Sequence, residues 1–336
     1  MGVKILLTGG AGYIGSHTYT ELVAAGFEVV IIDNFSNARH DVLDRLEIIT
    51  GAPVTCLEGD VLDADFLDQV FATHDFAAVV HFAAKKAVGE SVEQPLAYFT
   101  TNCTGFSTLL GAMQRANVRR VVFSSTATVY GVPEVLPLPE NHALRPESPY
   151  AVNKLVCENL LQQLETSDAR WSYGILRYFN PVGAHDSALI GEDPNGIPNN
   201  LMPYIAKVAT GELGKVSVYG DDYDTPDGTG VRDYIHVVDL AKGHVQSLRL
   251  LIEQDESHIV NLSTGIGYSV MDMLHAYERA SGKTLPFEIT GRRAGDIDGF
   301  WGDPTHAEAL LGFKAARDLD DMCTSSWNWV SRLKNT

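Results

Sequence analysis

The chain has 336 residues, which at roughly 150 residues per domain indicates about two domains and allows a sizeable buried core. It carries 25 Lys and Arg residues against 43 Asp and Glu residues, a formal net charge of −18 at pH 7. This charge repels phosphate backbones and anionic lipid headgroups. The composition therefore argues against nucleic-acid partners and against membrane association.

The cysteines and histidines form no pattern typical of a disulfide framework or a metal site. The four cysteines, at positions 56, 103, 157 and 323, lie far apart, and no two of the 11 histidines are spaced as HxxxH. We therefore expect no metal, and reduced thiols as in a cytoplasmic protein. No apolar run approaches the roughly 20 residues of a membrane helix, and no signal peptide is expected.

Short apolar runs alternate with helical patterns through the first half of the chain. The runs cover residues 5–7, 29–32, 54–57, 78–82, 121–123 and 175–176, and one helical pattern extends over 96–116. Near-continuous apolar strands separated by helices are typical of a parallel sheet covered on both faces. This order predicts an α/β fold with a Rossmann-type doubly wound parallel sheet.

The second half reads differently. Residues 181–203 are rich in Gly, Pro and Asn, which predicts an irregular segment, and a second loop is predicted over 220–230. A helix at 239–251 and a strand at 259–262 resume the earlier alternation. We expect a first domain over 1–180 that also receives about 236–263, and a smaller, discontinuous C-terminal α/β domain over 181–336.

A glycine pattern follows the first predicted strand. Gly9, Gly12 and Gly15 are spaced as GxxGxxG, and a predicted helix comes next. Glycines allow a tight turn and let a pyrophosphate approach the helix N-terminus, where free N–H groups favour negative charge. The second strand ends at Asp33, whose carboxylate can bond the ribose hydroxyls of NAD and would repel the extra phosphate of NADP. A chance glycine turn is the alternative, but strand, spacing, helix and acid all favour NAD.

Two further segments come at the ends of predicted strands, where ligands bind in this architecture. Asp60 and Val61 follow the third strand, where a side chain could meet the adenine. Phe82, Ala83 and Ala84 follow the fourth, where small residues let the backbone lie against a cofactor. For each segment, ordinary packing is the equal alternative.

Tyr150 and Lys154 are four residues apart on a helix that Ser148 and Pro149 are predicted to start, so they share one helix face. A free tyrosine has a pKa of about 10 and is a poor base. A nearby ammonium and an oxidised nicotinamide would lower that pKa. An exposed ion-pair spacing is the common alternative, but beside the glycine turn we predict a catalytic pair. Residues 124–128 add hydroxyls after the fifth strand, one of which could bond the reacting oxygen.

These motifs resemble the extended short-chain dehydrogenase/reductases. A closer similarity, to the family of UDP-glucose 4-epimerases, extends from residue 3 to about residue 330. It is carried by segments 8–17, 86–91, 127–131, 177–184, 191–204 and 228–239.

The resemblance implies reversible epimerisation at carbon 4 of UDP-glucose and UDP-galactose through a 4-keto sugar, with transient hydride transfer to bound NAD. Tyr150 would take the proton of the 4-hydroxyl, Thr126 would bond the same oxygen, and Lys154 would bond the nicotinamide ribose and lower the pKa of Tyr150. A homodimer is also implied. The implied cofactor residues are Gly9, Gly12, Tyr13, Ile14, Gly15, Asp33, Asn34, Asp60, Val61, Phe82, Ala83, Ala84, Lys86, Asn102, Ser124, Tyr150, Lys154 and Phe179. For Asn102, a structural amide is the equal alternative.

The resemblance also assigns a nucleotide-sugar site. Its implied residues are Lys86, Thr126, Tyr150, Asn180, Asn200, Leu201, Ser217, Val218, Tyr219, Arg232, Tyr234, Arg293, Asp296 and Phe300. Arg232, Arg292 and Arg293 would supply the basic patch that a diphosphate needs in this acidic protein. Phe300 fills a position where a small residue would admit an N-acetyl group, so a preference for UDP-glucose and UDP-galactose is predicted.

The sequence argues against three other functions and leaves a fourth open. Dehydration of a nucleotide sugar needs an acid beside Thr126, where Ala127 stands, and a dinucleotide sensor tends to lack the Tyr–Lys pair. A P-loop at residues 282–284 fails because Tyr277 replaces the first glycine. A 4-epimerase of another UDP-sugar, a pentose, a uronate or an N-acetylhexosamine, stays open.

Overall fold

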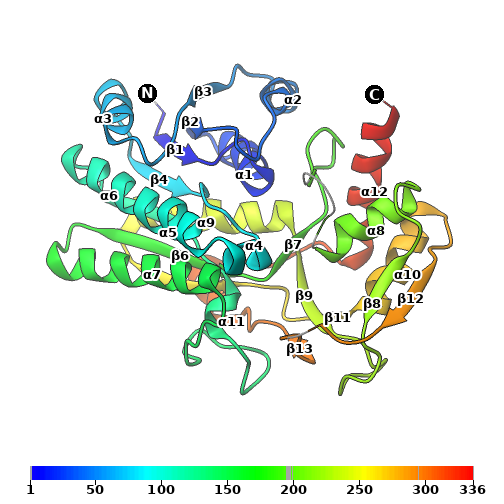
Figure 1. Ribbon diagram of the computed structural model, residues 1–336. Coiled ribbons are helices and arrows are strands. Elements are labelled where there is room, and N and C mark those ends of the chain that lie inside the picture. Colours follow the sequence, from blue (N-terminus) through cyan, green and yellow to red (C-terminus); the bar gives the residue numbers. More distant parts are fainter. Residues whose placement is uncertain (1, 194–197, 199, 294, 336) are drawn as a thin grey trace.

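The computed structural model describes residues 2–193, 198, 200–293 and 295–335. The first 180 residues and helix α9 gather on one side of the molecule. Strands β8, β9 and β12 lie on the other side with helices α8, α10 and α12 (Figure 1). The two sides meet where β7 follows β6 along the chain.

The larger side contains a seven-stranded sheet in the order β3-β2-β1-β4-β5-β6-β10, with every neighbouring pair parallel. The direction of winding reverses between β1 and β4, which is where ligands bind in such sheets. The predicted parallel sheet and the predicted strand at 259–262 are thus confirmed, and that strand pairs with β6. The strands are β1 Lys4–Thr8, β2 Glu28–Asp33, β3 Thr55–Glu58, β4 Ala78–His81, β5 Arg120–Ser124, β6 Ser172–Tyr178 and β10 His258–Leu262.

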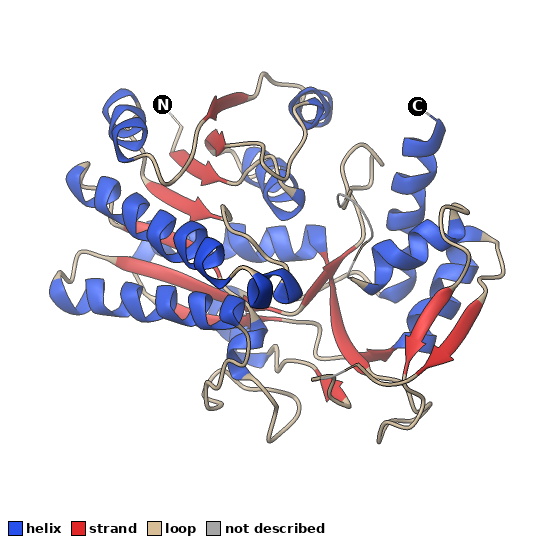
Figure 2. Ribbon diagram, viewed as in Figure 1, coloured by secondary structure: helices blue, strands red, loops and turns tan. Residues whose placement is uncertain are grey.

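Helices cover both faces of this sheet, so its strands face two cores (Figure 2). Successive side chains of a strand point to opposite faces. On β1, Leu6 packs with α3, α6 and α7, whereas Ile5 and Leu7 belong to the core that contains α1 and α9. The bounds are α1 Tyr13–Ala24, α2 Asp41–Thr50, α3 Ala64–Thr73, α4 Val88–Glu93, α7 Pro149–Ser167 and α9 Val237–Gln254.

The helical stretch predicted over 96–116 is present, but a π-helical turn divides it. The structure has helix α5 (Pro95–Phe99), a π-helical turn η1 (Thr100–Thr104) and helix α6 (Gly105–Arg115). A π-turn changes which side chains face inward. Here Asn102 points to the segment after β4, where its Oδ1 accepts from the Lys85 N–H at 2.8 Å and its Nδ2 donates to the Lys85 carbonyl at 3.0 Å. These two bonds tie the π-turn to that segment.

The smaller side is built from short strands and helices around its own core. β7 (Asn180–Val182), β11 (Gly267–Ser269) and β13 (Gly299–Phe300) all pair with β9 (Val231–His236), and β8 (Val216–Tyr219) pairs with β12 (Phe287–Thr290). Met202, Tyr234, Tyr277 and Met322 are among the buried residues of this core. Its helices are α8 Leu201–Ala209, α10 Val270–Ser281 and α12 Leu319–Asn335. Helix α11 (Thr305–Leu311) lies between them in sequence but packs on α9 and β10 of the larger side.

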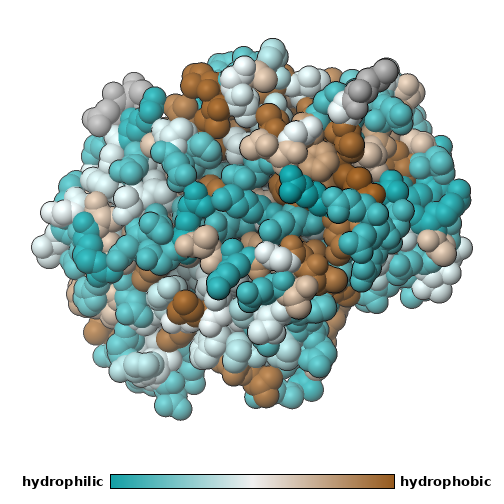
Figure 3. Space-filling view, turned by 180° about the vertical axis from the view of Figure 1, so that it is seen from behind, coloured by the Kyte–Doolittle hydropathy of each residue, from teal (hydrophilic) through white to brown (hydrophobic). Residues whose placement is uncertain are grey.

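The surface seen from behind is mostly hydrophilic, with hydrophobic side chains in separate patches (Figure 3). Within the described residues, no helix has the length and apolar character needed to cross a membrane. The same residues contain no cluster of His, Cys, Asp and Glu suited to a metal ion. All four cysteines are free thiols.

Candidate active site

The glycine turn joins β1 to α1 and leaves the start of α1 without a side-chain cap. Gly9 has φ +71°, and a Cβ there would lie 2.7 Å from the Ala83 backbone nitrogen. A Cβ on Gly15 would overlap the Gly9 carbonyl. The first turn of α1 contains no acidic residue. Uncapped N–H groups at a helix start suit a pyrophosphate, so this turn fits the phosphates of a dinucleotide.

Asp33 lies at the end of β2 beside this turn and is only 8% exposed. Its Oδ2 accepts from the Ala11 N–H and its Oδ1 from the Phe35 N–H, both at 3.0 Å. Burial raises the pKa of this carboxyl, while these N–H groups act in the opposite direction. Each carboxylate oxygen has a further lone pair for a ribose hydroxyl.

The neighbouring strand ends place the other predicted cofactor residues along the same edge. Asn34 Nδ2 donates to Asp60 Oδ2 at 2.8 Å. Val61 is buried, and a Cβ on Gly105 of α6 would lie 2.9 Å from it. The Phe82 ring lies 4.7 Å from the His244 ring. β3 and β4 end one to three residues before Asp60, Val61 and Phe82, so these residues belong to the loops after the strands.

A polar bridge joins the glycine turn to the second half of the chain. The Tyr13 hydroxyl donates to the Gly183 carbonyl at 2.7 Å. Lys86 Nζ lies 3.0 Å from Glu192 Oε1 and 5.9 Å from the centre of the Tyr13 ring. Glu192 Oε1 also accepts from Asn200 Nδ2 at 3.4 Å. Lys86, Tyr13 and Asn200 are therefore brought together, although they are far apart in sequence.

The predicted catalytic pair lies on the first turns of α7. Ser148 Oγ accepts from the Ala151 N–H at 3.2 Å, which caps the helix as expected. Tyr150 is 8% exposed and Lys154 is 4% exposed. Lys154 Nζ donates to the Ser124 carbonyl at 2.7 Å, and burial lowers the pKa of its ammonium to about 8. Both side chains are thus held against the end of β5.

The ionisation of Tyr150 is set mainly by its burial. Burial raises the pKa of its hydroxyl well above the usual range, and the nearby Tyr178 adds to this shift. Hydrogen bonding to Thr126 acts in the opposite direction. The lowering that we predicted from Lys154 and an oxidised nicotinamide stays a prediction.

The hydroxyls that follow β5 are arranged around this pair. Thr126 Oγ1 lies 3.0 Å from Thr128 Oγ1 and accepts from the Thr128 N–H at 3.2 Å. Ser124 Oγ lies 2.6 Å from the Tyr178 hydroxyl. Thr126 thereby caps the short 3₁₀ turn η2 (Ala127–Tyr130), and Ala127 is buried beside it.

On the smaller side, Asn180 and Arg232 come from paired strands. Asn180 Nδ2 donates to the Asp233 carbonyl at 2.8 Å, and the adjacent Tyr234 is buried. Arg232 Nη1 donates to the carbonyls of Val231 and Ile297, both at 2.9 Å. Its Nη2 lies 3.6 Å from Asp296 Oδ1.

Arg292 and Arg293 differ in their surroundings, although both are exposed. Arg292 forms ion pairs with Asp222 at 2.7 Å and with Asp298 at 3.8 Å. Arg293 lies over the Tyr219 ring, 3.7 Å from its centre, at the end of β8, which also carries Ser217 and Val218. The basic patch predicted from sequence is therefore partly neutralised at Arg292.

Phe300 is 9% exposed, and its ring centre lies 5.3 Å from that of Phe179. A Cβ on Gly302 would overlap the Phe179 ring. The two rings therefore form one apolar wall. Phe179 directly follows β6, and Phe300 belongs to β13, so the wall joins distant parts of the chain.

Asn200 and Leu201 lie at the start of α8.

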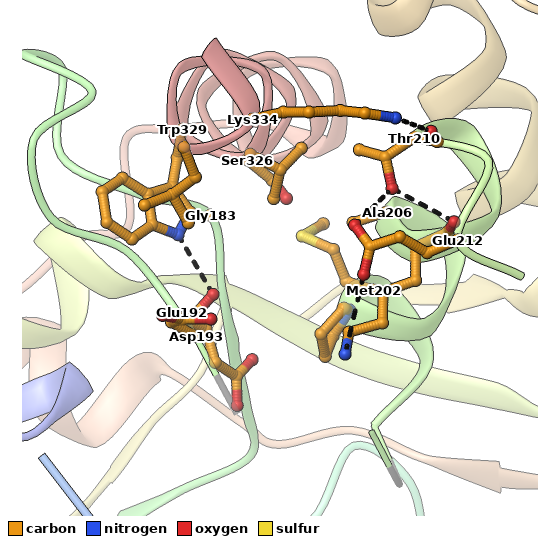
Figure 4. Close-up of a pocket in the computed structure, with 14 residues that line it drawn as sticks. Gly183, Glu192, Asp193, Met202, Ala206, Thr210, Glu212, Ser326, Trp329 and Lys334 are labelled. Carbon is orange, nitrogen blue, oxygen red and sulfur yellow. Dashed lines mark hydrogen bonds and ion pairs between the residues drawn. The ribbon is translucent and has the colours of Figure 1, made fainter. Parts of the chain in front are cut away.

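A cavity of about 280 Å³ lies between α8 and α12 (Figure 4). Met202 and Trp329 line it, and Trp329 Nε1 donates to the Glu192 carbonyl at 3.1 Å. Thr210 Oγ1 donates to Glu212 Oε1 at 2.9 Å on its far wall. The predicted site residues are not among those that line it in the described part of the chain.

Reasoning from sequence missed a buried acid below the catalytic pair. Glu158 is completely buried on α7 and forms an ion pair with Arg177 of β6 at 2.7 Å. Its position four residues after Lys154 places it on the same helix face, and this was the available signal.

A parallel sheet with a glycine turn at its switch point, and a Tyr–Lys pair on the helix after β5, define a dinucleotide-linked enzyme of the short-chain dehydrogenase/reductase class. Comparisons with known proteins narrow this class. A family model described as GDP-mannose 4,6 dehydratase matches residues 6–326. A UDP-glucose 4-epimerase from Bacillus subtilis is 53% identical over 333 residues, covering 99% of this chain and 98% of that protein. One from Bos taurus is 51% identical over 336 residues, covering 98% and 97%.

Solved structures agree with these relatives. A UDP-glucose 4-epimerase from Stenotrophomonas maltophila, with bound NAD and formylated UDP-arabinopyranose, has a TM-score of 0.98 and 48% identity, covering 99% of each chain. One from Bifidobacterium longum, in complex with NAD+ and UDP, has a TM-score of 0.94 and 49% identity, again covering 99% of each chain. This chain belongs to the UDP-glucose 4-epimerase family of extended short-chain dehydrogenase/reductases.

Proposed function

We propose that this protein interconverts UDP-glucose and UDP-galactose by inverting carbon 4 of the sugar, with NAD as its cofactor. The observation that carries the proposal is the meeting of Tyr150, Lys154 and Thr126 at the sheet edge beside the glycine turn. Two relatives of high identity were solved with NAD, one of them also with UDP.

The residues present fit NAD. Gly9, Gly12 and Gly15 leave room for its pyrophosphate at the start of α1, and Asp33 has free lone pairs for the adenosine ribose. Lys154 would hold the nicotinamide ribose. When bound, NAD supplies a hydride acceptor that can return the hydride to the sugar.

Proton transfer falls to Tyr150. Its hydroxyl would take the proton of the sugar 4-hydroxyl and later return it, and Thr126 would hold the same sugar oxygen. Burial alone opposes the phenolate. The site therefore needs positive charge near Tyr150, from the Lys154 ammonium and from the oxidised nicotinamide, before the tyrosine can act as a base.

The nucleotide would be held on the smaller side. Arg232 and Arg293 would bond the diphosphate, because guanidinium groups bond phosphate oxygens in pairs. Arg293 is exposed and stacked on Tyr219, so its charge remains accessible. The Phe179–Phe300 wall would limit the room beside the sugar.

Dehydration is the activity in the description of the family model. That reaction needs an acid beside Thr126 to expel a hydroxyl. The position holds Ala127, a buried residue that has no proton to donate. We therefore favour epimerisation. In that reaction the hydride leaves carbon 4 and returns to it, the proton leaves the oxygen on carbon 4 and returns to it, and no hydroxyl is expelled.

A pentose nucleotide is the second candidate substrate, because a relative of 48% identity was solved with formylated UDP-arabinopyranose. The test is to incubate the purified protein with UDP-galactose, without added cofactor, and to follow the anomeric signals by NMR. UDP-glucose rising to a fixed ratio supports the proposal. Silence with and without added NAD would refute it, and a parallel sample with a UDP-pentose tests the second candidate.

We also propose a homodimer in the cytoplasm. Large apolar side chains are exposed side by side on α4, α5 and α7, among them Val92, Leu96, Phe99 and Val152. Leu96 is 83% exposed, which is costly unless a second copy covers it. Sedimentation equilibrium of the wild type and of Leu96→Asp would test the dimer, and a monomeric wild type would refute it.

The cytoplasmic location is supported by the cysteines, because four free thiols agree with a reducing compartment.

We propose a dinucleotide-binding domain over residues 1–180, which contains six of the seven strands of the large sheet. The segment at about 236–263 would belong to it as well, because α9 packs on α1 and β10 pairs with β6. The remainder, over 181–336, would form the nucleotide-sugar domain.

A further inference from the structure

Three consecutive residues at the end of β5 face successive turns of α7. The Ser124 carbonyl accepts from Lys154 Nζ at 2.7 Å. Ser125 Oγ donates to Glu158 Oε1 at 2.5 Å, and the Thr126 hydroxyl lies near enough to Tyr150 to oppose the rise of its pKa. The three partners on α7 are spaced four residues apart, so they lie on one face of that helix. The bond between Ser125 and Glu158 involves neither Tyr150 nor Lys154.

Glu158 accepts two hydrogen bonds from Arg177 in addition to the one from Ser125. Arg177 donates to Glu158 Oε1 from Nε at 3.1 Å and to Oε2 from Nη2 at 2.7 Å. The side chain of Glu158 is 0% exposed and that of Arg177 is 3% exposed. A paired guanidinium and carboxylate fix each other's orientation in two directions. The carboxylate oxygen that receives the Ser125 hydroxyl therefore cannot turn freely.

Hydrogen bonds also extend from Arg177 toward the proposed substrate side. Arg177 Nη1 donates to the Tyr130 hydroxyl at 3.2 Å, which in turn donates to Asn261 Oδ1 at 2.7 Å. Asn261 Nδ2 donates to the Leu138 carbonyl at 2.8 Å. The Leu138 N–H donates to the Trp301 carbonyl at 2.9 Å, next to Phe300. A buried chain of bonds thus runs from α7 to the strand that carries the apolar wall.

Stability alone gives little reason for a buried ion pair here, because an apolar pair of similar volume is often as stable or more so. Directional bonds are what such a pair adds. We infer that Glu158 is a positioning residue for the proposed epimerisation: through Ser125 it holds the end of β5 in register with α7, so that Thr126 and Lys154 meet Tyr150 correctly. The inference rests on the proposed function.

Ser125→Ala tests this with the smallest change, because Glu158 keeps both bonds from Arg177. We expect kcat to fall about tenfold, or about 1.4 kcal/mol of barrier, with KM within about twofold of wild type. Bound NAD per chain and Tm should match those of Ser247→Ala. That control removes another buried hydroxyl, bonded to His258 at 2.7 Å on the far edge of the same sheet.

Glu158→Gln should lower kcat further, since it also leaves the Arg177 charge unpaired, and some loss of Tm is expected from it. A kcat of Ser125→Ala within about twofold of that of Ser247→Ala would overturn the inference. So would a fall in kcat matched by an equal fall in bound NAD per chain, because that result indicates lost folded protein. Wild-type protein measured beside the variants separates the two proposals: if it is active, such results overturn only the positioning role, and if it is silent, both fall.

Discussion

The catalytic edge and the nucleotide-sugar side of this molecule hold their functional groups in opposite ways. Tyr150, Lys154 and Thr126 are at most 8% exposed and are bonded to neighbouring strands or turns. The side chains of Arg232 and Arg292 are 24% and 40% exposed, and they rest on aspartates or aromatic rings. Chemistry needs groups fixed in a low-dielectric setting, whereas capture of an anion needs charges that solvent and ligand can reach. Substitutions at the catalytic edge should therefore alter turnover, and substitutions on the nucleotide-sugar side should alter substrate affinity.

The largest effect is expected from Tyr150→Phe. It removes the hydroxyl proposed to move the proton and leaves the buried ring in place. Turnover should fall by about a thousandfold, within the range that general acid–base groups contribute. The initial rate of UDP-galactose conversion checks this, with Tyr173→Phe as control, because Tyr173 is an equally buried tyrosine on β6. If Tyr150→Phe kept near-wild-type turnover, the Tyr150 hydroxyl would not be the group that moves the proton.

Arg293→Ala should mainly raise KM, by about tenfold or more, since a charge-assisted bond to phosphate is worth about 1.5–3 kcal/mol. Arg292→Ala is a matched comparison, because its guanidinium already pairs with Asp222 and Asp298, and it should have the smaller effect. Steady-state kinetics of both variants provide the measurement. If Arg292→Ala raised KM more than Arg293→Ala, our distinction between the two would be wrong.

Phe300→Ser should shift specificity rather than overall activity. It removes one of the two rings of the apolar wall and opens space beside Phe179. The ratio of kcat/KM for UDP-N-acetylglucosamine to that for UDP-glucose should rise about tenfold, as expected for added pocket volume. Phe287→Ser, at an exposed site on β12, is the control. An unchanged ratio would remove Phe300 from the specificity site.

The smallest effect concerns stability and pH. Burial lowers the pKa of Lys154 from 10.5 to about 8, so the unfolded chain binds more protons than the folded chain between these values. The free energy of unfolding of the wild type should therefore rise, relative to that of Lys154→Met, as the pH increases through this interval. Denaturant titrations of cofactor-stripped protein check the trend, with Lys215→Met, at an exposed lysine, as control. A constant difference between wild type and Lys154→Met would contradict it.

The parts of the fold and site that sequence predicts are those coded over short distances. The glycine turn, Asp33 at the end of β2 and the four-residue spacing of Tyr150 and Lys154 each depend on neighbours along the chain, and the structure has them on the expected elements. The helical character of residues 96–116 was also coded locally, but the apolar spacing gave no sign of the π-turn within this stretch. That turn accompanies the bonds of Asn102 to Lys85, 17 residues away.

The rest depends on pairs that no local pattern connects. Arg177 of β6 forms an ion pair with Glu158 of α7, and the Phe300 ring packs against the Phe179 ring, 121 residues earlier in the chain. Arg292 is neutralised by Asp222, which lies 70 residues before it. Each of these contacts changes what a residue can do, yet each joins residues that are distant in sequence, and the Phe179–Phe300 contact also joins the two sides of the molecule.

In the proposed reaction, one site removes hydrogen from carbon 4 and returns it to the other face of the same sugar. The decisive experiment gives the purified protein UDP-galactose carrying deuterium at carbon 4, in ordinary water and without added cofactor. We expect UDP-glucose that retains deuterium at carbon 4, and almost none from Tyr150→Phe. UDP-glucose with hydrogen from the solvent at carbon 4, or no UDP-glucose at all from wild-type protein supplied with NAD, would refute hydride return by bound NAD at this site.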